Sequence, residues 1–268
     1  MSTSIAMSYP VFKPLTYAYD CVSISDEYTI SQSMKSSSSF YSLSSSNIDS
    51  HLEKNSEWGA VAYLTQSSYG RNGTEVNINN MNFNNLNSKN IYAVTGVYGT
   101  GTGDSSVTAI GSVNAYNTTT GVKGSSNGNI TGVYDLNGCL LEYTAGYIKN
   151  GNASLSTYGT SFATTTTSTK YATVYPYNSS SDTYANNYTQ YSSNKTSTYG
   201  FGDAILETSN SGSGSTSWNS DGSYFPGNSL PFFSRAGVCS GTTGAGEFYF
   251  SHNVGGAYSN YGFRVVLI

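Results

Sequence analysis

Charged side chains are scarce in this chain of 268 residues. Asp, Glu, Lys and Arg make up 10% of it, against about 25% in an ordinary soluble domain, and the formal net charge is −4. A protein that holds nucleic acid through its phosphates needs a basic surface, so this balance argues against that class. The sequence also has no run of about 18 apolar residues, which predicts that no segment spans a membrane.

Cysteine, histidine and proline are rare as well, with 3, 2 and 5 residues. Cys21, Cys139 and Cys239 are widely spaced and odd in number, so they match neither a disulfide framework nor a zinc-binding motif. We predict that they are small buried hydrophobic residues. His51 is expected on a helix face and His252 in a loop, both as hydrogen-bonding residues with no catalytic role.

The chain is rich instead in small polar residues and tyrosine, with 29 Gly and 25 Tyr. Abundant aromatic residues and a low net charge are not typical of disorder. Tyr, Ser, Gly and Asn are the residues of antibody loops, where Tyr supplies contact area and the small polar residues supply adaptable hydrogen bonds. This composition favours a recognising or assembling protein over a metabolic enzyme.

The first ten residues, MSTSIAMSYP, lack the basic start and apolar stretch of a secretory signal peptide. The composition is nevertheless that of an extracellular protein. A virion protein accounts for both observations, because it folds in the host cytoplasm and leaves the cell by lysis. The alternative is a mature bacterial surface protein whose leader has been removed.

Two parts are expected along the chain. Residues 1–46 are predicted to be extended, with partial alternation from Tyr19 to Ile24, and then to form a Ser-rich loop from Ser31 to Ser46. We expect this segment to serve attachment or assembly, through other copies of the chain or other virion proteins. Residues 47–268 are expected to form one domain.

Within that domain, the clearest helix is predicted over residues 57–68, with Ser56 as its N-cap, and a shorter helix over 47–54. Two short strands are expected on either side of a turn at Asn137-Gly138. Further strands are predicted near the C-terminus, and the last of them is expected to be central because it is almost entirely apolar.

Four pieces of sequence, in order, resemble motifs of the formylglycine-generating-enzyme/sulfatase-modifying-factor family. They are EWGAVAYL at 57–64, GNITGVYDLNG at 128–138 with Glu142-Tyr143 after it, SRAG at 234–237 and GFRVV at 262–266. The resemblance implies a C-type-lectin-like α+β fold, with a twisted, mainly antiparallel sheet, one or two helices and long polar loops. More narrowly, the chain resembles a branch common in gut Firmicutes and their phages, whose members are structural or surface-exposed.

Catalytic members of that family hold copper with cysteines near the end of the domain. Cys239 lies in the corresponding region but has no second cysteine near it in the sequence, and a copper–thiolate site needs two soft ligands. We therefore expect no catalysis and no cofactor. The oxygens of Asp135, Asn137 and Glu142 could hold Ca²⁺, but a turn with buried hydrogen bonds is the favoured interpretation. Arg264 is expected to pair with Glu142.

The C-terminal loops are the expected ligand face, as in other lectin-like folds. The candidate contact residues are Trp218, Asn219, Tyr224, Phe225, Tyr249, Tyr258, Asn260 and Tyr261. We expect a non-enzymatic surface protein of a phage virion, as a head-decoration, head-fibre or tail-tip component that contacts a host surface protein or glycan. A bacterial adhesin or filament subunit is the alternative, and a copper-dependent oxidase of the formylglycine-generating type is the third hypothesis.

Overall fold

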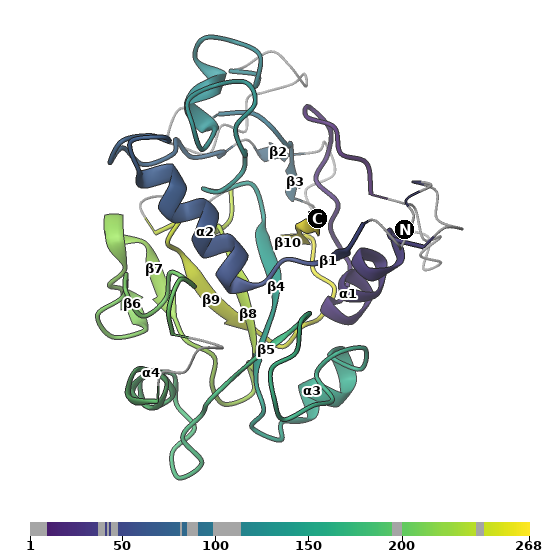
Figure 1. Ribbon diagram of the computed structural model, residues 1–268, viewed down its shortest axis with the longest axis vertical. Coiled ribbons are helices and arrows are strands. Elements are labelled where there is room, and N and C mark those ends of the chain that lie inside the picture. The colour runs from purple at the N-terminus through teal and green to yellow at the C-terminus, as the bar shows by residue number, and fades with distance from the viewer. Residues whose placement is uncertain are drawn as a thin grey trace.

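The computed structural model describes residues 10–36, 41, 43, 48–80, 82–84, 91–98, 114–194, 200–239 and 244–268. They form an α+β fold with helices arranged around a central sheet (Figure 1). The helices in these ranges are α1 (Ile24–Ser33), α2 (Asn55–Gln66), α3 (Ala153–Tyr158) and α4 (Tyr184–Ser193), with 3-10 turns at Gly121–Gly124 and Trp218–Ser220. None of these helices has the length and apolar character needed to cross a bilayer.

The main sheet has seven strands and is mixed. Its order is β10-β4-β8-β9-β7-β6, with β5 paired to the far end of β4, and smaller sheets are formed by β1 with β11 and by β2 with β3. The strands are β1 (Ser50–Leu52), β2 (Asn82–Asn84), β3 (Ile91–Ala93), β4 (Leu141–Ile148), β5 (Thr173–Tyr175), β6 (Ser213–Ser215), β7 (Gly222–Tyr224), β8 (Phe232–Arg235), β9 (Phe250–Asn253), β10 (Tyr261–Phe263) and β11 (Val265–Leu267).

Parallel pairs are as frequent as antiparallel ones in this sheet. β10 with β4, β4 with β5 and β7 with β9 are parallel, whereas β4 with β8, β8 with β9 and β6 with β7 are antiparallel. The expected α+β class with few helices is confirmed; the main sheet is mixed, the two smaller sheets are antiparallel, and the described ranges hold four α-helices where one or two were expected. Long connections over the sheet permit the parallel pairs, which a hairpin cannot make.

Helices cover both faces of β4 and β8, so alternate residues of these strands point into different cores. Phe232 packs with Ile24 of α1 and Leu155 of α3, while its neighbour Phe233 packs with Tyr191 of α4. This is the period of two that a strand imposes on its side chains. Burial on both faces makes β4 the central strand, and all eight of its residues are buried.

A buried polar network ties α2 to the sheet. The Arg235 Nε donates to Asn55 Oδ1 at 2.9 Å, and Thr144 Oγ1 donates to the same oxygen at 3.0 Å. The Asn55 Nδ2 in turn donates to the Tyr175 hydroxyl at 3.1 Å. Arg235 also donates to the carbonyl oxygen of Asp203. Since buried polar groups are costly unless hydrogen-bonded, this network fixes where α2 lies over the sheet.

The N-terminal part of the chain is not extended throughout. Ile24–Ser33 is the helix α1, capped by the Ser23 side chain, which accepts from the Asp26 backbone N–H at 3.3 Å. The expected extended conformation is wrong there, because the cap and the burial of Ile24 favour a helix. Much of the predicted Ser-rich loop (residues 37–40, 42 and 44–46) lies outside the described residues. An assembly role for residues 1–46 stays a prediction.

Three further predictions of local structure are wrong. Residues 50–52 of the predicted helix 47–54 form β1, which pairs with β11. There is no hairpin at Asn137-Gly138: only the second expected strand forms, as β4, while Gly138 bridges to Asn79. The C-terminal strand β11 is not central either, because it pairs with β1 outside the main sheet. Its apolar residues meet α1 and the N-terminal segment, which the local sequence does not reveal.

The predicted helix over 57–68 is confirmed as α2, although it begins at Asn55, so that Ser56 is inside it and is not the cap. Strands are also confirmed near the C-terminus, as β8, β9, β10 and β11.

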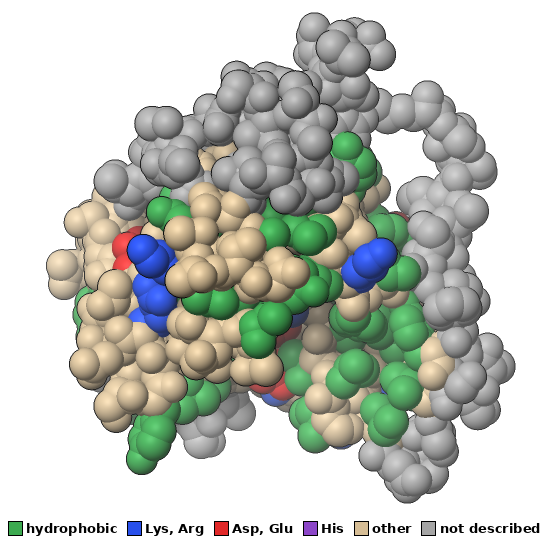
Figure 2. All heavy atoms as spheres, turned by 90° about the horizontal axis from the view of Figure 1, so that it is seen from above, with side chains coloured by type: hydrophobic (Ala, Val, Ile, Leu, Met, Phe, Trp, Pro, Cys, Tyr) green, Lys and Arg blue, Asp and Glu red, His purple; other side chains and the backbone are tan. Residues whose placement is uncertain are grey.

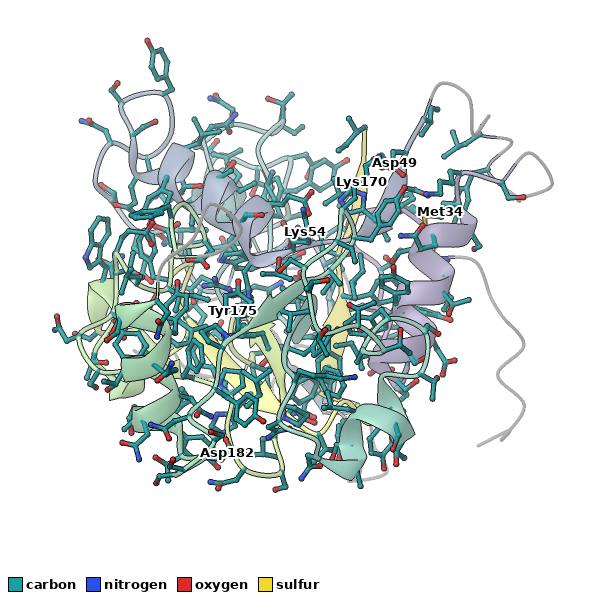
Figure 3. The ribbon with its side chains drawn as sticks, turned by 60° about the horizontal axis from the view of Figure 1, so that its bottom comes forward. Met34, Asp49, Lys54, Lys170, Tyr175 and Asp182 are labelled. Carbon is teal, nitrogen blue, oxygen red and sulfur yellow. The ribbon has the colours of Figure 1, made fainter. Side chains whose placement is uncertain are left out.

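Asp49, just before β1, forms salt bridges with two lysines from other segments. Asp49 accepts from Lys35 Nζ at 2.9 Å and from Lys170 Nζ, and the labelled Asp49 and Lys170 lie next to each other (Figure 3).

Candidate functional site

The eight predicted contact residues do not form one continuous surface. Trp218 and Asn219 lie on a turn beside α2, where the Trp218 ring contacts those of Phe248 and Tyr63 at 5.1 and 6.3 Å. Tyr224 ends β7 and contacts His252 of β9, and Phe225 follows it directly. The others, Tyr249, Tyr258, Asn260 and Tyr261, come just before β9 or just before and at the start of β10. We therefore describe two separate groups, the Trp218 turn and the tyrosine row.

The Trp218 turn, residues 217–221, holds a large aromatic side chain partly in solvent. Trp218 is 48% exposed, and its backbone N–H donates to Thr208 O at 2.9 Å. Asn219 and Ser220 follow with φ of 60° and 67°. Two successive residues with a side chain in the left-handed region are costly, and such strain persists only where the surroundings impose it. The indole is thus presented by a turn of defined shape.

Asp221, the last residue of this turn, lies close to two other acidic side chains, Glu75 and Glu247. Asp221 accepts from the Phe248 backbone N–H at 2.9 Å and is fully buried, as is Glu247. Burial, together with the charge of the neighbouring Glu75, raises the pKa of Asp221 to about 9. Burial also raises the pKa of Glu247 to about 8 and that of Glu75 to about 7. At neutral pH these groups share protons, because ionising all of them would leave uncompensated buried charges.

The tyrosine row consists of Tyr249, Tyr261, Tyr258 and the fully buried Tyr143. Tyr261 stacks on Tyr143 with ring centroids 4.5 Å apart, and the Tyr258 ring is 5.8 Å from Tyr261. Asn253 links the first pair, donating to the Tyr261 hydroxyl at 2.9 Å and accepting from the Tyr143 hydroxyl at 2.8 Å. Burial raises the pKa of Tyr261 to about 12, and the Tyr249 hydroxyl adds to that rise. Tyr258, 41% exposed, is the outermost ring.

Two of the eight residues are wrong as contact residues. Phe225 is fully buried among Phe233, Tyr191 and other rings of the core. Tyr261 is only 6% exposed and supports Tyr258 from below. Both are aromatic residues of the core, and neither presents a face to a ligand. Trp218, Asn219, Tyr224 and Tyr258 are exposed, while Tyr249 and Asn260 are partly exposed.

The fold brings two cysteines together that the sequence places far apart. The Cys239 backbone N–H donates to Cys139 O at 3.0 Å, and both residues are buried. This confirms the predicted burial of Cys139 and Cys239, whereas Cys21 is exposed, so its predicted burial is wrong. Burial raises the pKa of the Cys139 thiol well above its usual range, and the negative charges of Asp135 and Glu142 add to that rise. The thiol of Cys139 is therefore held in its protonated form.

The carboxylates of Glu142 and Asp135 are engaged with hydrogen-bond donors, whereas the side-chain oxygen of Asn137 is buried without one. Glu142 accepts from Arg264 Nε at 3.0 Å and Nη2 at 2.7 Å, which confirms the predicted Arg264–Glu142 pair. Asp135 accepts from Asn79 Nδ2 at 2.7 Å, and the Asn137 Nδ2 donates to Val76 O at 2.9 Å. This pattern matches the turn with buried hydrogen bonds. Among the described residues, no group of three Asp, Glu, His or Cys side chains is arranged to hold a metal ion.

Both histidines make hydrogen bonds, but not from the expected elements. His51 lies on β1 and its Nε2 is 2.7 Å from Glu57 Oε1 of α2. His252 lies on β9, with Nδ1 2.9 Å from Phe225 O and its ring stacked on Tyr184. Burial lowers the pKa of His252, so its imidazole is neutral at pH 7. The predicted helix and loop positions are therefore wrong, since both residues belong to strands.

Sequence reasoning did not find the acidic cluster or the left-handed turn. Asn219 is the one available signal for the turn, because Asn tolerates the left-handed region better than most residues. The acidic cluster has no signal of this kind, since Glu75, Asp221 and Glu247 come from three distant segments.

No family model, curated protein or solved structure matches the chain, so the family resemblance stays a prediction.

Proposed function

We propose that this chain is a non-enzymatic surface protein of a phage virion, with a C-type-lectin-like scaffold, that contacts a host surface protein or glycan. Its place on the particle would be a head decoration, a head fibre or the tail tip. The contact is made through the Trp218 turn, with Tyr258 at the end of the tyrosine row as a second point. The exposed Trp218 on its strained turn is the observation that carries this proposal.

Trp218 has the properties of a binding anchor. Trp and Tyr dominate binding energy at interfaces, because they bring a large apolar area and lose little conformational freedom. The Trp218 ring already rests against Phe248 and Tyr63, so little further ordering is needed on binding. The low content of charged residues fits a contact based on stacking and hydrogen bonds, as glycans and uncharged protein surfaces offer.

Binding to intact cells tests the proposal. The purified chain is labelled with a lysine-reactive dye and added to a panel of Gram-positive bacteria and to a printed glycan array. We expect Trp218→Ala to lower the bound fraction at least tenfold, with the thermal unfolding midpoint within a few degrees of the parent. Tyr69→Ala removes an aromatic ring that is 89% exposed in another loop and serves as the matched control. Equal binding by the Trp218 and Tyr69 variants would contradict the proposal.

Assembly through the N-terminal segment is part of the same proposal. Val11 and Phe12 are 66% and 61% exposed, which is unusual for two adjacent apolar residues and typical of a contact site. Light scattering on the full chain is expected to show an oligomer that the double variant Val11→Glu, Phe12→Glu converts to a monomer. A monomer for both proteins would contradict the assembly role.

The contact between Cys139 and Cys239 favours the oxidase as a second candidate function. Two cysteines side by side supply the soft ligands that Cu(I) prefers, but only as thiolates, and burial disfavours the thiolate of Cys139. Competition for Cu(I) against a chromogenic chelator distinguishes the two functions. The oxidase requires tight Cu(I) binding that Cys239→Ser abolishes, and the virion protein requires none.

A further inference from the structure

A cavity of about 780 Å³ lies at the end of the molecule that carries the N-terminal segment. Residues 10–19 form one wall, the loop 132–135 another, and residues 262–265 of β10 and β11 close the side. Figure 2 looks onto this end and shows hydrophobic side chains gathered on both sides of a hollow. The volume is within the range of about 300–1,000 Å³ that is usual for small-molecule sites. None of the residues of the Trp218 turn lines it.

Aromatic rings make up much of the wall. Phe12, Tyr17 and Tyr19 line the cavity from the N-terminal segment, and Tyr134 and Phe263 line it from the opposite sides. Tyr19 and Phe263 meet edge to face, with centroids 5.8 Å apart. The faces of such rings carry partial negative charge and attract cations.

The lining carries two cationic side chains, Lys13 and Arg264, and two anionic ones, Asp135 and Glu142. Arg264 makes two hydrogen bonds with Glu142, and it also donates to the backbone carbonyls of Tyr134 at 3.2 Å and Asp135 at 3.5 Å. Lys13 is exposed at the rim, where solvent and salt screen its charge. Asp135 is the remaining charged residue of the lining.

The hydrogen bonds to the Asp135 carboxylate come from neutral donors, while the nearby guanidinium of Arg264 is shared with Glu142 and Glu53. The carboxylate of Asp135 accepts from Asn79 Nδ2 at 2.7 Å and from the Gly96 backbone N–H at 3.0 Å. Across the described part of the chain, no Lys, Arg or His side chain forms a salt bridge with it. Its backbone is in the left-handed region, with φ of 64°, so the fold imposes this conformation on it. A carboxylate fixed in this way at an apolar wall has no salt bridge of its own among the described residues.

We propose that this cavity binds a small organic cation, an ammonium group on an apolar body, with Asp135 as its counter-ion and the surrounding aromatic rings as its walls. The carboxylate attracts the cation more strongly here than in water, because the apolar wall lowers the local dielectric constant. The rings add cation–π attraction, which small quaternary ammonium ligands use with particular advantage. The proposal is independent of the surface contact proposed for Trp218.

Choline and its uncharged isostere 3,3-dimethylbutan-1-ol are the probes that isolate the charge. Each is titrated into the full-length protein by calorimetry and saturation-transfer NMR at physiological salt. We expect one choline to bind per chain, at least tenfold more tightly than the alcohol. Equal affinity for the two probes would show a merely apolar cavity, and no binding of either would show no site of this kind; each result overturns the proposal.

Variants locate the site. Asp135→Asn keeps the shape of the side chain and is expected to weaken choline binding at least tenfold while leaving the alcohol unaffected. Asp26→Asn, which removes an exposed carboxylate on α1, is the matched control and is expected to bind as the parent does. Should Asp135→Asn fail to fold, Tyr17→Ala tests the same cavity from its exposed rim and is expected to weaken choline binding several-fold. Unchanged choline binding in a folded Asp135 or Tyr17 variant overturns the proposal.

Discussion

Replacing Ile24 by Ala tests whether α1 belongs to the core of the domain. Ile24 is fully buried in the same core cluster as Tyr143 and Phe232, and its backbone N–H donates to Gly255 O at 3.0 Å. The substitution removes three carbon atoms, which at about 0.8 kcal/mol for each buried carbon is about 2.4 kcal/mol. The cavity left behind adds to this, within the measured range of about 2–5 kcal/mol for such changes.

Urea unfolding followed by tryptophan fluorescence and circular dichroism measures this loss. Trp58 is fully buried and reports on the core directly. Ile130→Ala makes the same chemical change at a site that is 52% exposed, and it is expected to alter the free energy of unfolding by less than about 0.5 kcal/mol. A loss below about 0.5 kcal/mol for Ile24→Ala as well would refute the reasoning, because α1 would then be an appendage of the N-terminal segment and not part of the core.

Two predictions concern pH. Burial raises the pKa of Glu247 to about 8 from an unfolded value near 4.3, so its contribution to stability is complete below pH 4 and is lost as the pH rises towards 8. In urea unfolding of Glu247→Gln from pH 5 to pH 8, the free energy of unfolding is expected to fall less steeply with pH than in the parent, by roughly 1 kcal/mol per pH unit. An unchanged slope would contradict this prediction. Burial opposes ionisation of Asp49, but hydrogen bonds from Lys170 and Lys35 lower its pKa, so its contribution is present above about pH 4 and is lost as the pH falls below that value. Asp49→Asn should therefore destabilise the protein more at pH 7 than at pH 2, and equal destabilisation at both pH values would argue against the ion pairs.

Local sequence patterns predicted those elements whose signal is complete within a few residues. The helix α2 follows from its apolar spacing, and the strands β8 and β9 follow from runs of aromatic residues. The helix α1 also carried a local signal, because Ser23 precedes Asp26 by three residues as a helix cap requires. That signal was outweighed by the apolar alternation from Tyr19 to Ile24, which is too short to distinguish a strand from a helix start.

The candidate site was predictable only in part, for the same reason. An aromatic residue in a polar loop can cover the core or face solvent, and the sequence around Phe225 does not differ in kind from that around Trp218. The difference is made by α4, whose Tyr188 and Tyr191 cover Phe225, while the described residues leave almost half of Trp218 in solvent. Both covering residues are more than thirty positions away in the sequence.

The sequence by itself determined the kind of surface this protein has and which segments form its main helix and C-terminal strands. Composition is a property of the whole chain, and periodicity is a property of neighbouring residues. Only the tertiary structure decided that β4 is central, that Cys139 meets Cys239, and that Asp135 faces an aromatic cavity with no salt bridge among the described residues. Each of these depends on contacts between distant segments, because burial, charge balance and pKa are set by what packs against a residue and not by its neighbours in the chain.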